Sequence, residues 1–258
     1  MDTARIGELL APFLQSDPPS ANPGELTQNQ VAQISTYIDL LIRWNSRINL
    51  TAIRTPEAIV TRHFGESLFA ARHLLFSSAN RSAGPAAVDA TGVPLVGPAH
   101  SGAQPPATEH LVDFGSGAGF PGLPMKIFSP RTRVTLIESN HKKVTFLREA
   151  IRALTLTNID VFPGRADDFA PASATRLTLR AVERFDTAIA TAIPLVAPGG
   201  VLALLIGQSQ VEHAQALAQR FGGRHRWPFP NQNPGSFCAA LRRLNSKKWE
   251  RAKLFWLL

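Results

Sequence analysis

The sequence predicts an α/β protein: a Rossmann-like, mostly parallel sheet preceded by an N-terminal helical extension. From residue 110 onward, short apolar segments alternate with helix-like segments, whereas the first 76 residues show helical periodicity. Repeated βα units of this kind form parallel strands that helices cover on both faces. Two further strand candidates near the C-terminus are joined by a loop too short for a crossover helix, so they add an antiparallel hairpin.

The extension, residues 1–76, contains at least three helix candidates. Residues 2–15 carry apolar side chains at helical spacing and end in a Pro-rich stretch. A second helix begins after Thr27, where Thr27 and Gln30 have the spacing of a capping box. An Arg-rich turn, RWNSRINLTAIR, then leads into a further helix.

Residues 77–109 are rich in Ala, Gly, Pro and Ser and show no sustained period, which is typical of a flexible insertion or linker. The sheet domain is therefore expected at 110–258. Its last residues, SKKWERAKLFWLL, predict a basic amphipathic helix. The five candidates for parallel strands are HLVDF (110–114), RVTLIE (133–138), IDVFPG (159–164), the less regular LTLRAV (177–182) and VLALLIG (201–207).

Composition limits the kind of partner. The net charge of +8 and a pI near 10.5 favour a polyanion, and nucleic acid first. The single cysteine, Cys238, excludes an internal disulfide framework and a CxxC zinc site, and we expect no metal. No segment has the length of a membrane-spanning helix, and the first residues lack a secretion signal. We therefore expect a cytoplasmic protein that does not contact membranes.

The stretch LVDFGSGAGFPGLPMK, residues 111–126, is the candidate ligand loop. Its four glycines follow a strand candidate and, lacking Cβ atoms, allow a sharp turn and close approach of a ligand. In an open α/β sheet such a loop borders the ligand crevice. GAGFPG matches the GxGxxG pattern of NAD-binding proteins, with Glu138 about 20 residues further on. VDFGSGAG instead resembles the acidic-x-G-x-G-x-G motif of S-adenosylmethionine methyltransferases, with Asp113 as the acidic residue.

Ligand chemistry favours the second interpretation without excluding the first. A pyrophosphate requires an exposed helix N-terminus and no nearby carboxylate, whereas S-adenosylmethionine has no phosphate and carries a sulfonium and an ammonium, so it tolerates Asp113. Glu138 suits either ligand because both contain a ribose with hydroxyl groups. The antiparallel end of the sheet also favours a methyltransferase.

Several separate segments, in order, resemble the RsmG (GidB) family of bacterial methyltransferases, which modify guanine N7 in 16S ribosomal RNA. The similarity runs from about Thr27 to Gly207 and is interrupted by residues 77–109. It implies S-adenosylmethionine as the cofactor and 16S ribosomal RNA, or the small ribosomal subunit, as the partner of a chain expected to be a monomer. The segments are RWNSRINLTAIRTPEAIVTRHFGESL, VDFGSGAGFPGLPMKI, LIESNHKKVTFLRE and LRAV.

The resemblance also implies site residues. Glu138 would hold the ribose, Ala166 and Asp167 would lie beside the adenine, and Arg180 would lie at the pocket mouth. The remaining residues expected at the cofactor are Asp113, Gly115, Gly117 and Phe120.

Residues of the Arg-rich turn and the next helix are candidates for contacting RNA, because they combine cations with an amide and ring systems. No catalytic acid or base is expected: guanine N7 already presents a lone pair, so positioning is sufficient. The RNA candidates are Arg47, Asn49, Arg62 and His63.

Two residues depart from the family pattern: Glu66 stands where Asp is usual, and Ile206 stands where Lys is usual. The loss of the Lys removes a cation near the cofactor end of the fifth strand. Two alternatives therefore stay open, namely a non-catalytic RNA- or nucleotide-binding protein with the same fold, and an NAD-dependent oxidoreductase.

Overall fold

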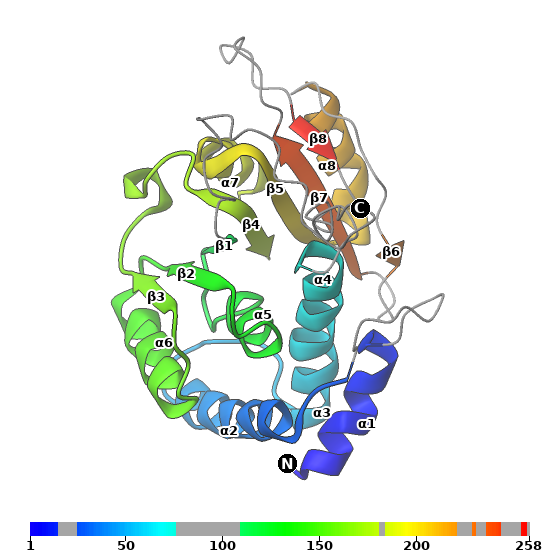
Figure 1. The fold of residues 1–258 in the computed structure, drawn as a ribbon, viewed down its shortest axis with the longest axis vertical. Helices are drawn as coiled ribbons and strands as arrows, with labels where there is room; N and C mark the ends of the chain where they lie inside the picture. The colour runs from blue at the N-terminus through cyan, green and yellow to red at the C-terminus, as the bar shows by residue number, and fades with distance from the viewer. Residues whose placement is uncertain are drawn as a thin grey trace, which may run out of the picture.

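In a computed structural model, the chain forms one sheet of eight strands with helices packed against both faces (Figure 1). The structure describes residues 1–14, 25–75, 109–180, 184–220, 229–230, 236–243 and 254–256. The insertion expected at 77–109 therefore lies outside the described residues, apart from residue 109. So does the side chain of Cys238.

The strand order is β3-β2-β1-β4-β5-β7-β6, and β8 pairs with β7. The first five strands are parallel, whereas β7 runs antiparallel to β5, β6 and β8. Chain order reverses between β1 and β4, which places the topological switch point, and with it the expected ligand crevice, at their C-terminal ends. The bounds are β1 (His110–Phe114), β2 (Arg133–Ile137), β3 (Ile159–Phe162), β4 (Ala174–Arg180), β5 (Val196–Gly207), β6 (Phe229–Pro230), β7 (Ser236–Arg243) and β8 (Leu254–Trp256).

The five parallel strands confirm the fold class, but some elements have other bounds. β4 begins at Ala174, three residues before the predicted start, and β5 begins at Val196, five residues before its predicted start, because Ala174 already pairs with Val196. The C-terminal helix is a wrong prediction at residues 254–256: they form β8, whose backbone pairs with the edge of β7. Pairing along a strand edge outweighs an amphipathic sequence pattern there.

The N-terminal third is helical as predicted. The capping box is present: the N–H of Thr27 donates to Gln30 Oε1 (2.8 Å) and that of Gln30 donates to Thr27 Oγ1 (3.3 Å). The elements are α1 (Thr3–Leu14), α2 (Gln28–Asn45), α3 (Pro56–Ala58), the π-helix η1 (Ile59–Gly65) and α4 (Glu66–Leu75).

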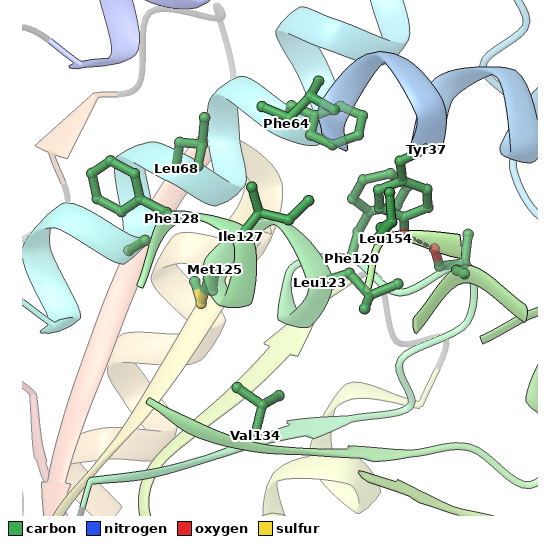
Figure 2. Close-up of a cluster of buried hydrophobic side chains, with 14 of the residues drawn as sticks. Tyr37, Phe64, Leu68, Phe120, Leu123, Met125, Ile127, Phe128, Val134 and Leu154 are labelled. Carbon is green, nitrogen blue, oxygen red and sulfur yellow. Dashed lines mark hydrogen bonds between the residues drawn. The ribbon is translucent and has the colours of Figure 1, made fainter. Parts of the chain in front are cut away.

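Two hydrophobic cores lie on the two faces of the sheet. The first joins α1, α2, η1 and α4 to α5 and α6, so the N-terminal extension and the sheet share one continuous apolar interior (Figures 1 and 2). The second lies beneath α7 and α8. The helices and 3-10 turns of this part are α5 (Gly122–Phe128), α6 (His141–Ala153), η3 (Ala166–Asp168), α7 (Phe185–Ala192), η4 (Ile193–Leu195) and α8 (Gln208–Arg220).

Strand β5 shows how its sequence serves both cores. Val201, Ala203 and Leu205 belong to the first core, while the alternate residues Leu202, Leu204 and Ile206 belong to the second. Ile206 is only 6% exposed and is therefore a packing residue, at the position where the resemblance led us to expect Lys. Among the described residues, no helix is long and apolar enough to cross a membrane.

Candidate cofactor and substrate site

The loops that follow β1, β2 and β3 meet at the C-terminal edge of the sheet. Ser116 N–H donates to Ile137 O (2.9 Å), and Gly117 N–H donates to the Glu138 carboxylate (2.8 Å). Glu138 N–H in turn donates to Phe162 O (3.1 Å), at the end of β3. The predicted residues Gly117 and Glu138 are therefore in direct contact, and the segment with Ala166 and Asp167 follows β3 at the same edge.

The glycine loop has an open half and a packed half. Gly115 and Gly117 have φ of +66° and +57°, and a Cβ at Gly115 would meet no atom within 4 Å. A Cβ at Gly119, by contrast, would lie 2.5 Å from Tyr37 Oη, and one at Gly122 would lie 2.8 Å from Asp113 Oδ2. Only the first two glycines border open space, so a ligand can approach the loop there.

Asp113 lies beneath the loop and is fully buried. Its carboxylate accepts from Gly122 N–H (3.1 Å) and from the Thr178 hydroxyl (2.8 Å). Burial raises its pKa to about 6, although the hydrogen bonds from Thr178, Ser116 and Gly122 and the charge of Arg180 oppose the rise. Asp113 thus fixes the loop to β4, and its carboxylate does not face the open half.

An aromatic cluster supports the packed half of the loop (Figure 2). The Tyr37 ring stacks on Phe120 with 5.3 Å between centroids, and the Tyr37 hydroxyl donates to Ala118 O. Phe64 meets both rings edge to face. Phe120 is only 7% exposed, so its ring serves mainly to join the loop to α2 and η1. Tyr37 was not predicted, although it is the only tyrosine and lies on the apolar face of α2.

Arg180, at the end of β4, is hydrogen-bonded to the π-helix η1 and to the first residue of α4. One guanidinium nitrogen, Nη2, donates to Arg62 O (2.8 Å) and to Glu66 Oε2 (2.8 Å). Glu66 is itself buried and also lies 3.9 Å from the exposed Arg62 guanidinium. Burial lowers the pKa of Arg180, while the charge of Glu66 opposes this. Glu66, where the resemblance led us to expect Asp, therefore supplies the counter-charge for Arg180.

His63 lies in the same corner. Its ring stacks on Phe120 with 4.5 Å between centroids, and its Nε2 lies 2.7 Å from Thr51 Oγ1. Burial, followed by the charges of Arg180 and Arg62, lowers the pKa of His63 to about 3, so the imidazole is neutral at physiological pH. Among the described residues, the buried side-chain polar atoms without a hydrogen-bond partner are His63 Nδ1 and Arg180 Nη1.

The other two RNA candidates, Arg47 and Asn49, are exposed in the turn after α2. The amide that shapes this turn belongs to Asn45, which was not predicted. Its Oδ1 accepts from Leu50 N–H (2.9 Å) and Thr51 N–H (3.1 Å), and its Nδ2 donates to Thr51 O (3.0 Å). Trp44 packs against Phe146 of α6.

The start of α5 separates the two ligands that the sequence left open. Gly122 N–H bonds Asp113, Leu123 N–H bonds Gly119 O, Met125 N–H bonds Pro121 O, and Pro124 has no N–H. This helix N-terminus therefore has no free N–H donors for a pyrophosphate. The NAD interpretation requires such donors, so the structure does not support it. The open glycines beside the Glu138 carboxylate fit S-adenosylmethionine, because Glu138 can accept from a ribose diol and the glycines admit a ligand against the main chain. Among the described residues, no cluster of potential metal ligands occurs.

The fold and this site define an S-adenosylmethionine-dependent methyltransferase. A family model described as "GidB: rRNA small subunit methyltransferase G" matches residues 30–82 and 101–223, and leaves out only part of the predicted insertion between them. The chain belongs to this family.

Curated relatives agree with the family model. The chain is 36% identical to ribosomal RNA small subunit methyltransferase G of Xanthomonas oryzae over 189 residues, which are 73% of this chain and 74% of that protein. It is 34% identical to the protein of the same name from Streptococcus pyogenes serotype M49, over 80% of each chain. The corresponding Exiguobacterium protein is 32% identical, over 78% of this chain and 76% of its own.

Among solved structures, TYW2 of P. horikoshii in complex with MeSAdo has 19% sequence identity and a TM-score of 0.42 over 53% of this chain and 56% of that one. TYW2 of M. jannaschii in complex with AdoMet has 18% identity and a TM-score of 0.42, over 52% and 67%.

Proposed function

We propose that this chain transfers the methyl group of S-adenosylmethionine to N7 of a guanine in 16S ribosomal RNA. The observation that carries the proposal is the open half of the glycine loop beside Glu138, at the sheet edge where α5 offers no free N–H donors. The family to which the chain belongs supports ribosomal RNA as the substrate.

We assign the cofactor contacts by position. The main chain at Gly115 and Gly117 would border the methionine part, the Glu138 carboxylate would accept from the ribose, and η3, with Ala166 and Asp167, would flank the adenine. Ala166 is buried and Asp167 is exposed, so the first offers an apolar contact and the second a free carboxylate. Asp113 and Phe120 support the loop from below, and Arg180 lies at the pocket mouth.

The chemistry requires positioning and no proton transfer. S-adenosylmethionine supplies an electrophilic methyl group on a sulfonium. The N7 lone pair forms the new N–C bond, and the electron pair of the broken S–C bond stays on sulfur. Neutral His63 adds no positive charge to this corner of the site, and the charge of Arg180 is matched by Glu66. The chain thus contributes by holding the two reactants in line.

For RNA binding we propose the exposed face of the turn after α2 and the adjoining π-helix. Arg47, Arg54 and Arg62 are exposed there and can pair with phosphates, and Asn49 offers an amide to a base edge or a ribose. We further propose that the chain works as a cytoplasmic monomer on 16S ribosomal RNA or on the small ribosomal subunit.

The test uses small ribosomal subunits from cells that lack the modification. Incubation with methyl-labelled S-adenosylmethionine should label 16S RNA, and borohydride and aniline treatment should then cleave it at the modified guanine. A related enzyme from the same family is the positive control. No label under conditions in which that control is active would refute the proposal. It would favour a non-catalytic RNA-binding protein, for which saturable S-adenosylmethionine binding is the remaining check.

A further inference from the structure

We propose that Tyr37, in the N-terminal extension, is a positioning residue for the cofactor: its hydroxyl holds the glycine loop in the conformation that binds S-adenosylmethionine. The extension is then part of the cofactor site and not only a surface for RNA. This inference rests on the function proposed above, and in particular on the placement of the cofactor beside Gly115 and Gly117.

The glycine loop needs restraint from outside, because its glycines supply little of their own. Gly115, Gly117 and Gly119 have φ of +66°, +57° and +86°, in the left-handed region that glycine adopts at no steric cost. Glycine reaches other regions just as readily, so the peptide groups of this loop can rotate with little hindrance. Hydrogen bonds to the loop must therefore select the one conformation that is seen.

The middle of the loop is held by the extension. Two carboxylates of the sheet domain accept hydrogen bonds from the loop at its start and at its end. Between them lies the peptide group that joins Ala118 to Gly119. Its N–H donates to Ser116 O (2.6 Å), within the loop, and its carbonyl oxygen accepts from the Tyr37 hydroxyl in a buried hydrogen bond. Among the described residues, this is the side-chain hydrogen bond that joins the extension to the glycine loop.

The direction of this hydrogen bond follows from the two groups. A carbonyl oxygen only accepts, so the Tyr37 hydroxyl donates. Burial, followed by the charge of Asp113, raises the pKa of Tyr37 above its ordinary value, so the hydroxyl keeps its proton. Without the hydroxyl, the oxygen of Ala118 is a buried acceptor that lacks its partner, which favours rotation of the peptide group. That rotation changes the main chain directly after Gly117, in the open half of the loop.

The side chain of Tyr37 is fixed by its neighbours (Figure 2). It is fully buried, and its ring stacks on Phe120 with 5.3 Å between centroids and an interplanar angle of 11°. Phe64 meets the other side of this pair edge to face, 5.2 Å from Tyr37. The hydroxyl therefore has a defined position above the loop.

The helix that carries Tyr37 is tied to the sheet domain as well. Gln30 Nε2 donates to Ile127 O (2.8 Å) in the last turn of α5, and Gln33 Nε2 donates to Leu154 O (2.8 Å) at the end of α6. Carbonyl groups at a helix C-terminus have no intrahelical donor, so these contacts satisfy groups that the sheet domain leaves open. Helix α2 thus holds Tyr37 at a fixed height above the loop.

The test compares two full-length variants that lose a similar amount of stability. Tyr37→Phe keeps the ring on Phe120 and removes only the hydroxyl. The matched control, Ile34→Val, removes one buried carbon from the same helix and the same hydrophobic core, away from the loop hydrogen bonds. Urea denaturation shows that both variants are folded and how far each is destabilised.

Isothermal titration calorimetry then measures cofactor binding. The Kd for S-adenosylmethionine should rise about five- to tenfold in Tyr37→Phe, the effect of one buried hydrogen bond. In Ile34→Val it should stay within about twofold of the wild type, because the loop hydrogen bonds are intact. Equal Kd values for Tyr37→Phe and the wild type would overturn the proposal. So would the same rise in both variants, because the loss of affinity would then follow from stability alone.

Hydrogen–deuterium exchange of the cofactor-free proteins gives a local measurement. In Tyr37→Phe, uptake should be faster in peptides that contain residues 115–121 and unchanged in those from the remainder of α5 and from α6. Ile34→Val should not increase uptake in the loop. Wild-type uptake in the loop of Tyr37→Phe would contradict the proposal.

The failure of this inference can be told apart from failure of the proposed function. If the wild type binds S-adenosylmethionine but forms no 7-methylguanosine, the methyl transfer fails and the binding test of Tyr37 still decides its role. If Gly115→Ala leaves the Kd unchanged, the cofactor lies elsewhere and the role of Tyr37 falls with that placement. If Gly115→Ala raises the Kd and Tyr37→Phe does not, only the role of Tyr37 is refuted.

Discussion

A cation and a histidine are buried at each of the two edges of the sheet, but the hydrogen bonding of these side chains differs between the edges. At the N-terminal edge, Lys126 Nζ donates to Pro130 O (2.7 Å) and Thr132 O (2.6 Å). There, both ring nitrogens of His110 are bonded, one to Ser173 O (3.0 Å) and one to Thr135 Oγ1 (2.9 Å). At the C-terminal edge, His63 and Arg180 each keep one buried atom unpartnered.

Burial lowers the pKa of all four groups, so perturbed titration does not distinguish the edges. The difference lies in hydrogen-bond satisfaction. Groups that are fully bonded to their own chain have a structural role, whereas buried groups that keep an unpartnered polar atom can still accept a contact from outside the chain.

Lys126→Met should destabilise the protein strongly, because it leaves the carbonyl groups of Thr132, which is buried, and of Pro130 without their charged donor. The free energy of unfolding should fall by about 3 kcal/mol, measured by urea denaturation, while the folded variant still binds S-adenosylmethionine with unchanged affinity. The control is Arg131→Met, which removes an exposed cation from the same segment and should change stability by less than about 0.5 kcal/mol. A large loss of cofactor affinity in Lys126→Met would contradict the structural role of the N-terminal edge.

Asp113 and His63, both at the C-terminal edge, should affect the pH dependence of the free energy of unfolding in opposite directions. The pKa of Asp113 is raised from 3.8 to about 6, so its contribution falls as pH rises through this range, by about 3 kcal/mol in total. The pKa of His63 is lowered from 6.5 to about 3, so its contribution falls as pH decreases below 6.5. Between pH 4 and 6 the two slopes oppose each other.

Asp113→Asn removes one of these slopes. Relative to the wild type, its free energy of unfolding should decrease by about 1.4 kcal/mol more for each pH unit of acidification between pH 6 and 4. Urea denaturation at half-unit pH intervals measures this difference. Parallel curves for variant and wild type would show that Asp113 is ionised throughout the range.

Gly115→Ala tests the open half of the glycine loop. Because φ is +66° but no atom lies within 4 Å of the added Cβ, stability should fall by only about 1 kcal/mol. The methyl group would project into the space assigned to the cofactor, so the Kd for S-adenosylmethionine should rise about tenfold, as measured by isothermal titration calorimetry. An unchanged Kd would place the cofactor elsewhere. Gly119→Ala is the contrasting variant, since it should fail in folding through the contact with Tyr37.

What the sequence predicted well was local. The strands, the capping box and the glycine loop each depend on residues close together in the chain, and their periodicity or spacing is visible in it. The resemblance to the family singled out Glu138, whose carboxylate accepts from Gly117 N–H, and it marked Glu66 as a departure, but it gave no reason for Glu66. That reason is an ion pair with Arg180, 114 residues away.

The sequence-based predictions failed or missed residues where the role of a residue depends on contacts with distant parts of the chain. The sequence treated all four loop glycines alike, but Gly119 is required by the Tyr37 hydroxyl from α2 and Gly122 by the Asp113 carboxylate. Asn49 was predicted as a site residue because it is an amide near several arginines. The amide whose hydrogen bonds shape the turn is instead that of Asn45. The spacing of residues in the sequence does not indicate which side chain of a distant element a residue will contact.

Arg47→Ala should have the smallest effect, limited to RNA binding. Arg47 is exposed in the turn whose Thr51 contacts His63, so it lies toward the C-terminal edge. Loss of one phosphate contact should weaken binding to small subunits by roughly three- to fivefold and reduce the slope of log K against log salt by about one, with no change in S-adenosylmethionine affinity. Arg131→Ala, an exposed cation just before β2 at the opposite edge, should leave both quantities unchanged. Filter binding across a salt series distinguishes the two variants. If Arg131→Ala weakened subunit binding as much as Arg47→Ala, the RNA would have to cover both edges, and basic charge alone would account for the affinity.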